Sequence, residues 1–300
     1  MKKRSFAYAL LGLATVATVS AFFANRSFSA GEIGIPALAK ETHFHGIAVD
    51  GNDPTRLHLA THHGFYVVGP DGKARRFSKN RDDFMGFTPH PSDPSVLYAS
   101  GHPAGGGNLG FIASMDGGKS WAKLAEGVGG PVDFHQMDVS KADPNVIYGV
   151  HRGLQRSADG GRTWSKVGPV PDGLIDFAAS GKDADTLYAA TKTGLLKSVD
   201  AGRSWQLAHI VKRPATMIQV SARGDVYAFI IGTGLVRADD GGANWRLVSN
   251  AFGGAYVLHM AVDQTDDRKL YAVTLNPETR AQAVLLSEDG GATWNSLADN

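Results

Sequence analysis

Short runs in which apolar and polar residues alternate follow one another along most of the chain, separated by turns rich in glycine, proline and aspartate. Alternation with a period of two predicts half-buried β-strands. The first group reads as four such strands, A to D, with the sequences HGIAV, LHLAT, FYVVG and KARRF. A turn followed by an alternating strand recurs six times, as DPTRLHLA, DPSVLYAS, DPNVIYGV, ADTLYAAT, RGDVYAFI and DRKLYAVT. Six groups are therefore predicted, beginning near His43, Asp83, Asp133, Gly173, Ala215 and Tyr256.

An eight-residue phrase recurs five times and ends each time in one of the five tryptophans of the protein. Its copies are SMDGGKSW (Ser114–Trp121), SADGGRTW (Ser157–Trp164), SVDAGRSW (Ser198–Trp205), ADDGGANW (Ala238–Trp245) and SEDGGATW (Ser287–Trp294). Successive tryptophans lie 43, 41, 40 and 49 residues apart. Such a period without a helical pattern predicts an all-β propeller of four-stranded antiparallel blades, with six blades expected and seven as the alternative. Residues 31–42 are too short for a further blade, and we expect them at most to pair with the last one.

The eight-residue phrase resembles the Asp-box, or BNR, repeat S-x-D-x-G-x-T-W, and the resemblance extends in phase from Gly46 to Asn300. Proteins with this repeat are β-propellers, among them sialidases, some endoglucanases, sortilin-type receptors and photosystem II assembly factors of the Ycf48 type. The chain is also similar to exported bacterial propellers that carry sialidase-like or glycosyl hydrolase labels. The resemblance implies the fold and leaves the function open, because the shared element is structural.

The N-terminal sequence predicts export. The basic segment MKKR precedes an uncharged apolar run from Phe6 to Ala24, which is the pattern of a signal peptide. The run has 19 residues, which is also long enough for a retained signal anchor. We therefore predict a signal peptide or N-terminal signal anchor in residues 1–30 and a propeller domain in residues 31–300. The expected location is the periplasm or the extracytoplasmic face of the membrane, either free or tethered, and we expect a monomer.

Composition narrows the chemistry. The net charge of +1 gives no electrostatic reason to expect a nucleic-acid partner. The absence of cysteine excludes thiolate catalysis and thiolate metal sites.

Histidines gather where the predicted blades align. The A strands of the first three blades begin HFHGIAV, DFMGFTP and DFHQMDV, so that His45, Met85 and His135 share one position. His43, Asp83 and Asp133 share the position two residues earlier, on the same side of the strand. The ends of the B strands carry His62 with His63, then His102, then His151. In an antiparallel meander the start of A and the B–C loop lie on one face, so these side chains are predicted to converge on one mouth of the channel.

Imidazole is the commonest protein ligand for metals, and a neighbouring thioether favours a soft or borderline ion. The leading hypothesis is therefore an exported binding or assembly module with a copper site at this mouth, and zinc as the alternative ion. The candidate ligands are His43, His45, His62, His63, Met85, His102, His135 and His151. Asp83 and Asp133 would orient imidazoles or bind a harder ion. An organic or peptide ligand, and histidines that only hydrogen-bond one another, stay open as alternatives.

The rival hypothesis is a carbohydrate-active enzyme in which Asp83 and Asp133 are the catalytic carboxylates of a glycoside hydrolase. Few aromatic residues at the predicted mouth are available to stack on sugar rings. A true sialidase is not expected, because it needs three arginines and only Arg152 is predicted at the mouth. Either hypothesis predicts a protein partner or a glycan at the propeller mouth.

Overall fold

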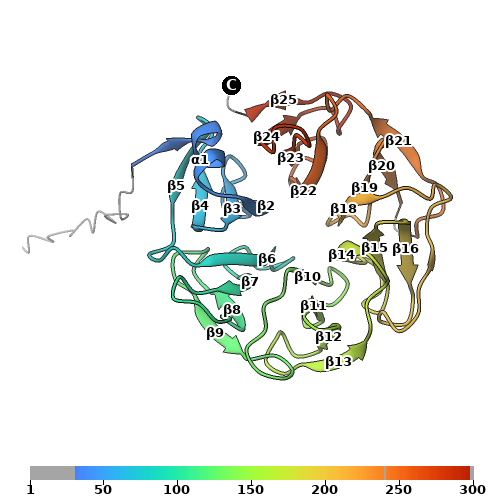
Figure 1. Cartoon of the computed structure of the whole chain (residues 1–300), viewed down its shortest axis with the longest axis horizontal. Helices are drawn as coiled ribbons and strands as arrows, with labels where there is room; N and C mark the ends of the chain where they lie inside the picture. Colours follow the sequence, from blue (N-terminus) through green and yellow to red (C-terminus); the bar gives the residue numbers. More distant parts are fainter. Residues whose placement is uncertain (1–30, 240, 298–300) are drawn as a thin grey trace, which may run out of the picture.

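In the computed structural model, which describes residues 31–239 and 241–297, six sheets stand around a central opening like the blades of a propeller (Figure 1). The prediction of a six-bladed all-β propeller is confirmed. The predicted signal peptide or anchor in residues 1–30 lies outside the described residues. Among the described residues, none of the helices is long and apolar enough to cross a bilayer.

Each blade is a meander in which the innermost strand comes first in the sequence and the outermost comes last. Blade 1 contains β2 (Phe44–Val49), β3 (Leu57–Thr61), β4 (Gly64–Val68) and β5 (Lys73–Arg76). Blade 2 contains β6 (Asp83–Pro89), β7 (Leu97–His102), β8 (Phe111–Ser114) and β9 (Ala122–Ala125), and blade 3 contains β10 (Gln136–Val139), β11 (Ile147–Val150), β12 (Leu154–Ser157) and β13 (Ser165–Gly168).

The second half of the ring repeats this order. Blade 4 contains β14 (Leu174–Ala179), β15 (Leu187–Thr191), β16 (Gly194–Ser198) and β17 (Gln206–Leu207). Blade 5 contains β18 (Ala215–Val220), β19 (Val226–Ile230), β20 (Gly234–Ala238) and β21 (Arg246–Ser249). Blade 6 contains β22 (Tyr256–Val262), β23 (Leu270–Leu275), β24 (Gln282–Ser287) and β25 (Asn295–Ser296). The innermost strands begin at or within a few residues of the six predicted starts.

The segment before blade 1 forms β1 (Ile33–Gly34) and the short helix α1 (Ile35–Glu41). β1 pairs with β5, the outer strand of blade 1, and not with the last blade. The expectation that these residues pair with the last blade is therefore wrong for the strand. Glu32 forms ion pairs with Lys73 and Arg75 of β5, which gives a physical reason for this choice.

α1 lies in the seam between blades 1 and 6. Its buried side chains, Ile35 and Leu38, belong to one apolar cluster with Leu59 of blade 1 and with Tyr271 and Val284 of blade 6. Each sheet is made from one continuous stretch of the chain, so that among the described strands none is shared between the first and last blades. The ring is therefore closed by side-chain packing instead of by strand exchange.

The eight-residue phrases form tight turns that carry a tryptophan between blades. In the second copy, the Ser157 hydroxyl donates to Asp159 Oδ1 (2.8 Å), and it accepts from the Gly161 amide (2.8 Å). The Trp164 ring packs against Phe134 of its own blade and Phe111 of blade 2, with centroids 4.8 and 5.2 Å apart. Gly161 lies so close to Phe111 that a Cβ there would fall 2.1 Å from its ring. The turn therefore requires glycine for contact between blades as well as for its positive φ.

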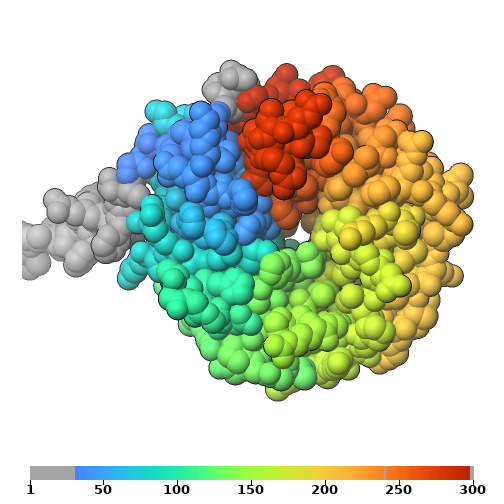
Figure 2. All heavy atoms as spheres, viewed as in Figure 1, coloured from blue at the N-terminus to red at the C-terminus, as the bar shows by residue number. Residues whose placement is uncertain are grey.

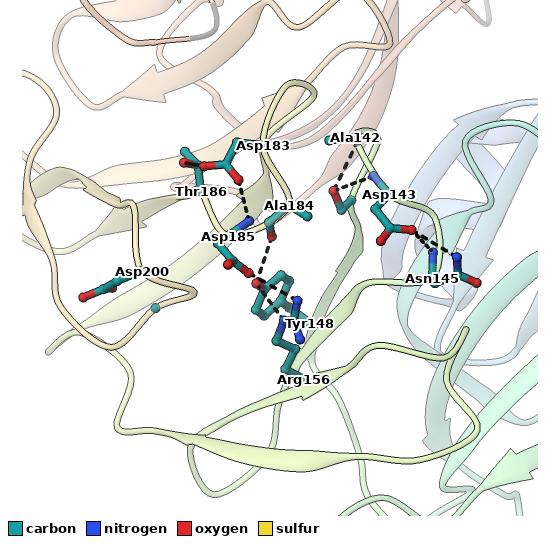
Figure 3. A network of polar contacts seen from close by, with 12 residues as sticks. Ala142, Asp143, Asn145, Tyr148, Arg156, Asp183, Ala184, Asp185, Thr186 and Asp200 are labelled. Atoms are coloured by element: carbon teal, nitrogen blue, oxygen red, sulfur yellow. Dashed lines mark hydrogen bonds and ion pairs between the residues drawn. The ribbon is translucent and has the colours of Figure 1, made fainter.

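Polar contacts add to the packing between blades 3 and 4 (Figure 3). The Tyr148 hydroxyl donates to the Ala184 carbonyl (2.9 Å). Arg156 donates to that same hydroxyl through Nε (3.2 Å) and to Asp185 through a terminal nitrogen (3.2 Å). The first of these bonds satisfies the hydroxyl of the buried Tyr148, whereas the Arg156–Asp185 pair lies at the exposed edge of the contact.

Candidate functional site

The structure places the starts of the inner strands and the loops after the second strands at one end of the channel. The His62 amide donates to the His43 carbonyl (3.0 Å), and Asp83 lies opposite His102 across β6 and β7. We call this end, where His45, His62, Asp83, His102, Asp133 and His135 lie, the histidine mouth. All six of these side chains come from blades 1 to 3.

A β-bulge recurs in five of the six inner strands and turns side chains toward the channel. In β2 the register shifts between Phe44 and Gly46, which leaves His45 as the extra residue. Corresponding shifts occur in β6, β14, β18 and β22. Bulges re-aim side chains and are frequent beside functional sites. The side chain of Phe44, just before the bulge, stays buried in the core.

The first group of ligand-type atoms, the Asp83 triad, joins blades 1 and 2. His45 Nδ1 lies 3.0 Å from Asp83 Oδ1, and His62 Nδ1 lies 2.7 Å from Asp83 Oδ2. Each carboxylate oxygen therefore accepts a hydrogen bond from one imidazole N–H. Asp83 is buried, whereas the His62 side chain is 52% exposed. Burial alone would raise the pKa of Asp83, but the hydrogen bonds and charges of the two histidines bring that pKa below its ordinary value.

The second group, the Asp133 triad, joins blades 2 and 3. His102 Nε2 and His135 Nε2 lie 3.0 and 2.7 Å from the same atom, Asp133 Oδ2. The other carboxylate oxygen, Oδ1, is buried and has no hydrogen-bond partner among the described residues. The hydrogen bond to Asp133, opposed by burial, raises the pKa of His135 above its ordinary value, and the negative charge of Asp83 adds to this increase.

Hydrogen bonding of His102 assigns its tautomer. Its Nδ1 lies 2.8 Å from the Gly107 carbonyl oxygen, which can only accept, so Nδ1 carries a hydrogen. In the neutral ring Nε2 then carries a lone pair and no hydrogen. This lone pair points at the lone pairs of Asp133 Oδ2. Such an arrangement is stable when a cation, either a proton or a metal ion, lies between the two atoms. The Asp83 triad needs no cation, because both of its imidazoles can donate through Nδ1.

The four other predicted ligands lie around the two triads. His43 is exposed, and its side chain has no hydrogen bond to another described residue. The exposed His63 ring lies 4.8 Å from the His62 ring, centroid to centroid. His151 Nδ1 lies 3.1 Å from the Asp133 carbonyl oxygen and supports the backbone there. Met85 is half-buried in β6, two residues after Asp83.

The channel behind the mouth is a cavity of about 330 Å³, and Figure 2 shows the opening at the centre of the ring. Its lining runs from His45 and His135 at the mouth to Asp50 at the far end of β2. Two carboxylates in it join neighbouring blades. Asp138 accepts from the Ala179 amide and Asp176 accepts from the Ile218 amide, both at 2.9 Å.

His259 is a channel residue that the sequence alignment missed. The bulge in β22 leaves Leu258 as the extra residue, at the position that His45 has in β2, and His259 follows it. Both Leu258 and His259 line the channel. Burial, with a smaller contribution from His45, lowers the pKa of His259 to about 4. The imidazole is therefore neutral at neutral pH.

Asp176 makes the stability of the fold depend on pH. Burial raises the pKa of its carboxyl to about 7, the Ile218 and Phe177 amides oppose this change, and the charge of Asp138 adds to it. In the unfolded chain the pKa has its ordinary value of 3.8. The unfolded state therefore ionises first as the pH rises, and stability from this group is lost between the two values. We expect the free energy of unfolding to fall more steeply across this range in the wild type than in Asp176→Asn, measured by urea unfolding at constant ionic strength. Parallel pH profiles would contradict this expectation.

No protein-family model and no curated protein sequence matches the chain. Among solved structures, the GH74 xyloglucanase from Xanthomonas campestris is 19% identical with a TM-score of 0.54, over 85% of this chain and 45% of that enzyme. The extracellular domain of the hybrid two-component system BT4673 from B. thetaiotaomicron is 12% identical with a TM-score of 0.56, over 89% of this chain and 34% of that one. A YCF48 structure with a bound D1 peptide is 18% identical over 73% of this chain and 83% of that one, and its TM-score of 0.46 supports no further conclusion. The chain spans less than half of the first two proteins, and these likenesses show the propeller fold alone.

Proposed function

We propose that the protein is an exported binding module that holds one divalent transition-metal ion in the Asp133 triad and presents it at the histidine mouth to a partner protein. The observation that carries the proposal is the convergence of two imidazole nitrogens and a carboxylate oxygen whose positions lie within 4.8 Å of one another. Ligand atoms of a tetrahedral site with bonds of 2.0–2.2 Å are separated by roughly 3.3 Å, so small side-chain rotations would complete the coordination.

Two details favour the Asp133 triad over the Asp83 triad. The Nδ1–H group of His102 donates a hydrogen bond to the Gly107 carbonyl. Histidines that bind a metal through one ring nitrogen usually make such a contact through the other. Asp133 also places a single carboxylate oxygen, Oδ2, against both imidazole nitrogens, so that one ion can contact all three atoms. By contrast, both oxygens of Asp83 already accept hydrogen bonds.

Copper(II) is the first candidate ion and zinc is the alternative. Sites of nitrogen and oxygen ligands bind copper(II) more tightly than zinc, and both ions suit imidazole. Three protein ligands leave at least one coordination position open at an exposed surface, since the His135 side chain is 55% exposed. A ligand from the partner protein or water would fill that position.

The contacts of Asp83 and Asp133 favour binding over glycoside hydrolysis. Each carboxylate is shared between two imidazoles, whereas a glycosidase needs one carboxyl to protonate the leaving group and a second to attack or activate water. Asp176, the channel carboxyl with a raised pKa, accepts hydrogen bonds from the Phe177 and Ile218 amides through its two oxygens. It is therefore engaged between blades.

The test is the metal content of the purified protein after loading with copper(II) or zinc and removal of excess ion, measured by mass spectrometry. We expect about one bound ion per chain in the wild type and almost none in His102→Ala/His135→Ala. The matched control is His43→Ala, which removes an imidazole at the same mouth but outside the triads and should keep the ion. Wild-type protein without stoichiometric metal would refute the proposal.

A further inference from the structure

The loop that follows His102 extends across the neighbourhood of both triads. We call residues 103–110, which join β7 to β8, the glycine loop. The Ala104 amide donates to Asp82 Oδ1 (3.1 Å), beside the Asp83 triad. The Asn108 side chain donates to the Pro131 carbonyl (2.9 Å), two residues before Asp133. Between these contacts, the Gly107 carbonyl accepts from His102 (2.8 Å).

The tip of the loop has little else to hold it. Gly105, Gly106 and Gly107 are exposed, and a Cβ at any of them would meet no atom within 4 Å. Gly106 and Gly107 have φ values of +86° and +88°, which are accessible to glycine at little cost. A segment with no buried side chain and so much backbone freedom opens at low free energy. The base of the loop is fixed by backbone hydrogen bonds from Leu109 to Gly101 and from Gly110 to Val132. The position of the tip, by contrast, depends mainly on the three hydrogen bonds that involve Asp82, His102 and Pro131.

We propose that the glycine loop is a clamp that metal binding in the Asp133 triad locks, through the His102–Gly107 hydrogen bond. This inference rests on the proposed function and adds a regulation of the same site. A metal ion on Nε2 of His102 fixes the tautomer that carries hydrogen on Nδ1, and it makes that N–H a stronger donor. The ion therefore strengthens the bond to Gly107 and stabilises the loop over the mouth.

The coupling acts in both directions. If the ion stabilises the closed loop, then the closed loop increases the affinity for the ion by the same factor. A partner that displaces the loop would therefore weaken metal binding and promote release of the ion to that partner. The clamp thus links presentation of the ion to docking at the mouth.

The experiment uses zinc as the probe, because zinc has no redox chemistry. Hydrogen exchange of the amides in residues 104–109 is measured with and without zinc, and zinc release is followed by transfer to a strong chelator. We expect zinc to slow exchange of the loop in the wild type. In Asp82→Ala/Asn108→Ala, which loses two loop contacts and keeps the triad, we expect zinc to be released about 10-fold faster, at the lower end of outer-shell effects.

The matched control is Asn276→Ala, in the corresponding loop of blade 6, where Asn276 Oδ1 accepts from the Glu278 and Thr279 amides. It should release zinc at the wild-type rate. One bound zinc with unchanged loop exchange and unchanged release in the double variant would overturn the clamp alone. Absence of stoichiometric zinc from the wild type would overturn the proposed function and the clamp together.

Discussion

The variant Ile35→Ala/Leu38→Ala is expected to lose about 4–10 kcal/mol of unfolding free energy, at about 2–5 kcal/mol for each buried side chain. Ile35 and Leu38 are only 2% and 1% exposed, and they lie in the cluster that joins blades 1 and 6. Truncation of a buried side chain elsewhere in the ring would leave a cavity in only one of several contacts between adjacent blades. At this seam the two α1 side chains pack against residues of both blades, so their truncation weakens the contact that closes the ring.

Urea unfolding monitored by tryptophan fluorescence measures this effect. The matched control is Lys40→Ala, which changes an exposed residue of the same helix and should leave stability within about 0.5 kcal/mol of the wild type. A double variant within about 1 kcal/mol of the wild type would show that α1 does not hold the seam.

The second large effect is expected in metal affinity, which should differ between the isosteric variants Asp133→Asn and Asp83→Asn. Asp133→Asn is expected to weaken copper(II) and zinc affinity by more than about 100-fold, beyond the 10–100-fold range of outer-shell changes. The reason is that it removes the charge that faces both His102 Nε2 and His135 Nε2. Asp83→Asn is expected to weaken affinity by less than about 10-fold, because in the proposal that carboxylate binds no ion and only contributes charge nearby.

Competition titration against a chelator of known affinity measures both variants under one set of conditions. Circular dichroism and thermal unfolding establish that each variant keeps its fold. Equal losses in the two variants would contradict the assignment of the ion to the Asp133 triad and would favour one site spread over both triads. A larger loss in Asp83→Asn would reverse the assignment.

The propeller was predictable because the sequence repeats the same pattern of turn and alternating strand six times. The turn phrase ending in Trp164 and the strand phrase beginning at Asp143 each recur with a period near 40 residues, and a period-two strand fixes which side chains enter the core. Phe44, Phe84 and Phe134, which alternate with the mouth positions along the chain, are accordingly buried. The gathering of histidines follows from the same topology, because in a meander the start of the first strand and the end of the second strand lie at the same end of the channel.

Pairing across blades was not predictable in the same way. Asp83 belongs to blade 2 by sequence, yet it contacts His45 and His62 of blade 1. Aligned repeats compare equivalent positions, whereas the triads join non-equivalent positions of neighbouring repeats. The bulges add a second source of error, because one extra residue moves the following side chains to the other face. For this reason His259, and not Leu258 alone, lines the channel near the mouth.

The seam between the first and last blades also constrains the order in which the molecule can be completed during synthesis. Synthesis starts at the N-terminus, so the apolar side chains of α1 are made about 250 residues before their partners in blade 6, such as Val284. Until β23 and β24 have been made, Ile35 and Leu38 lack the part of their packing surface that Tyr271 and Val284 provide. Closure of the ring at this seam therefore has to wait for blade 6, and until then the apolar face of α1 stays partly uncovered.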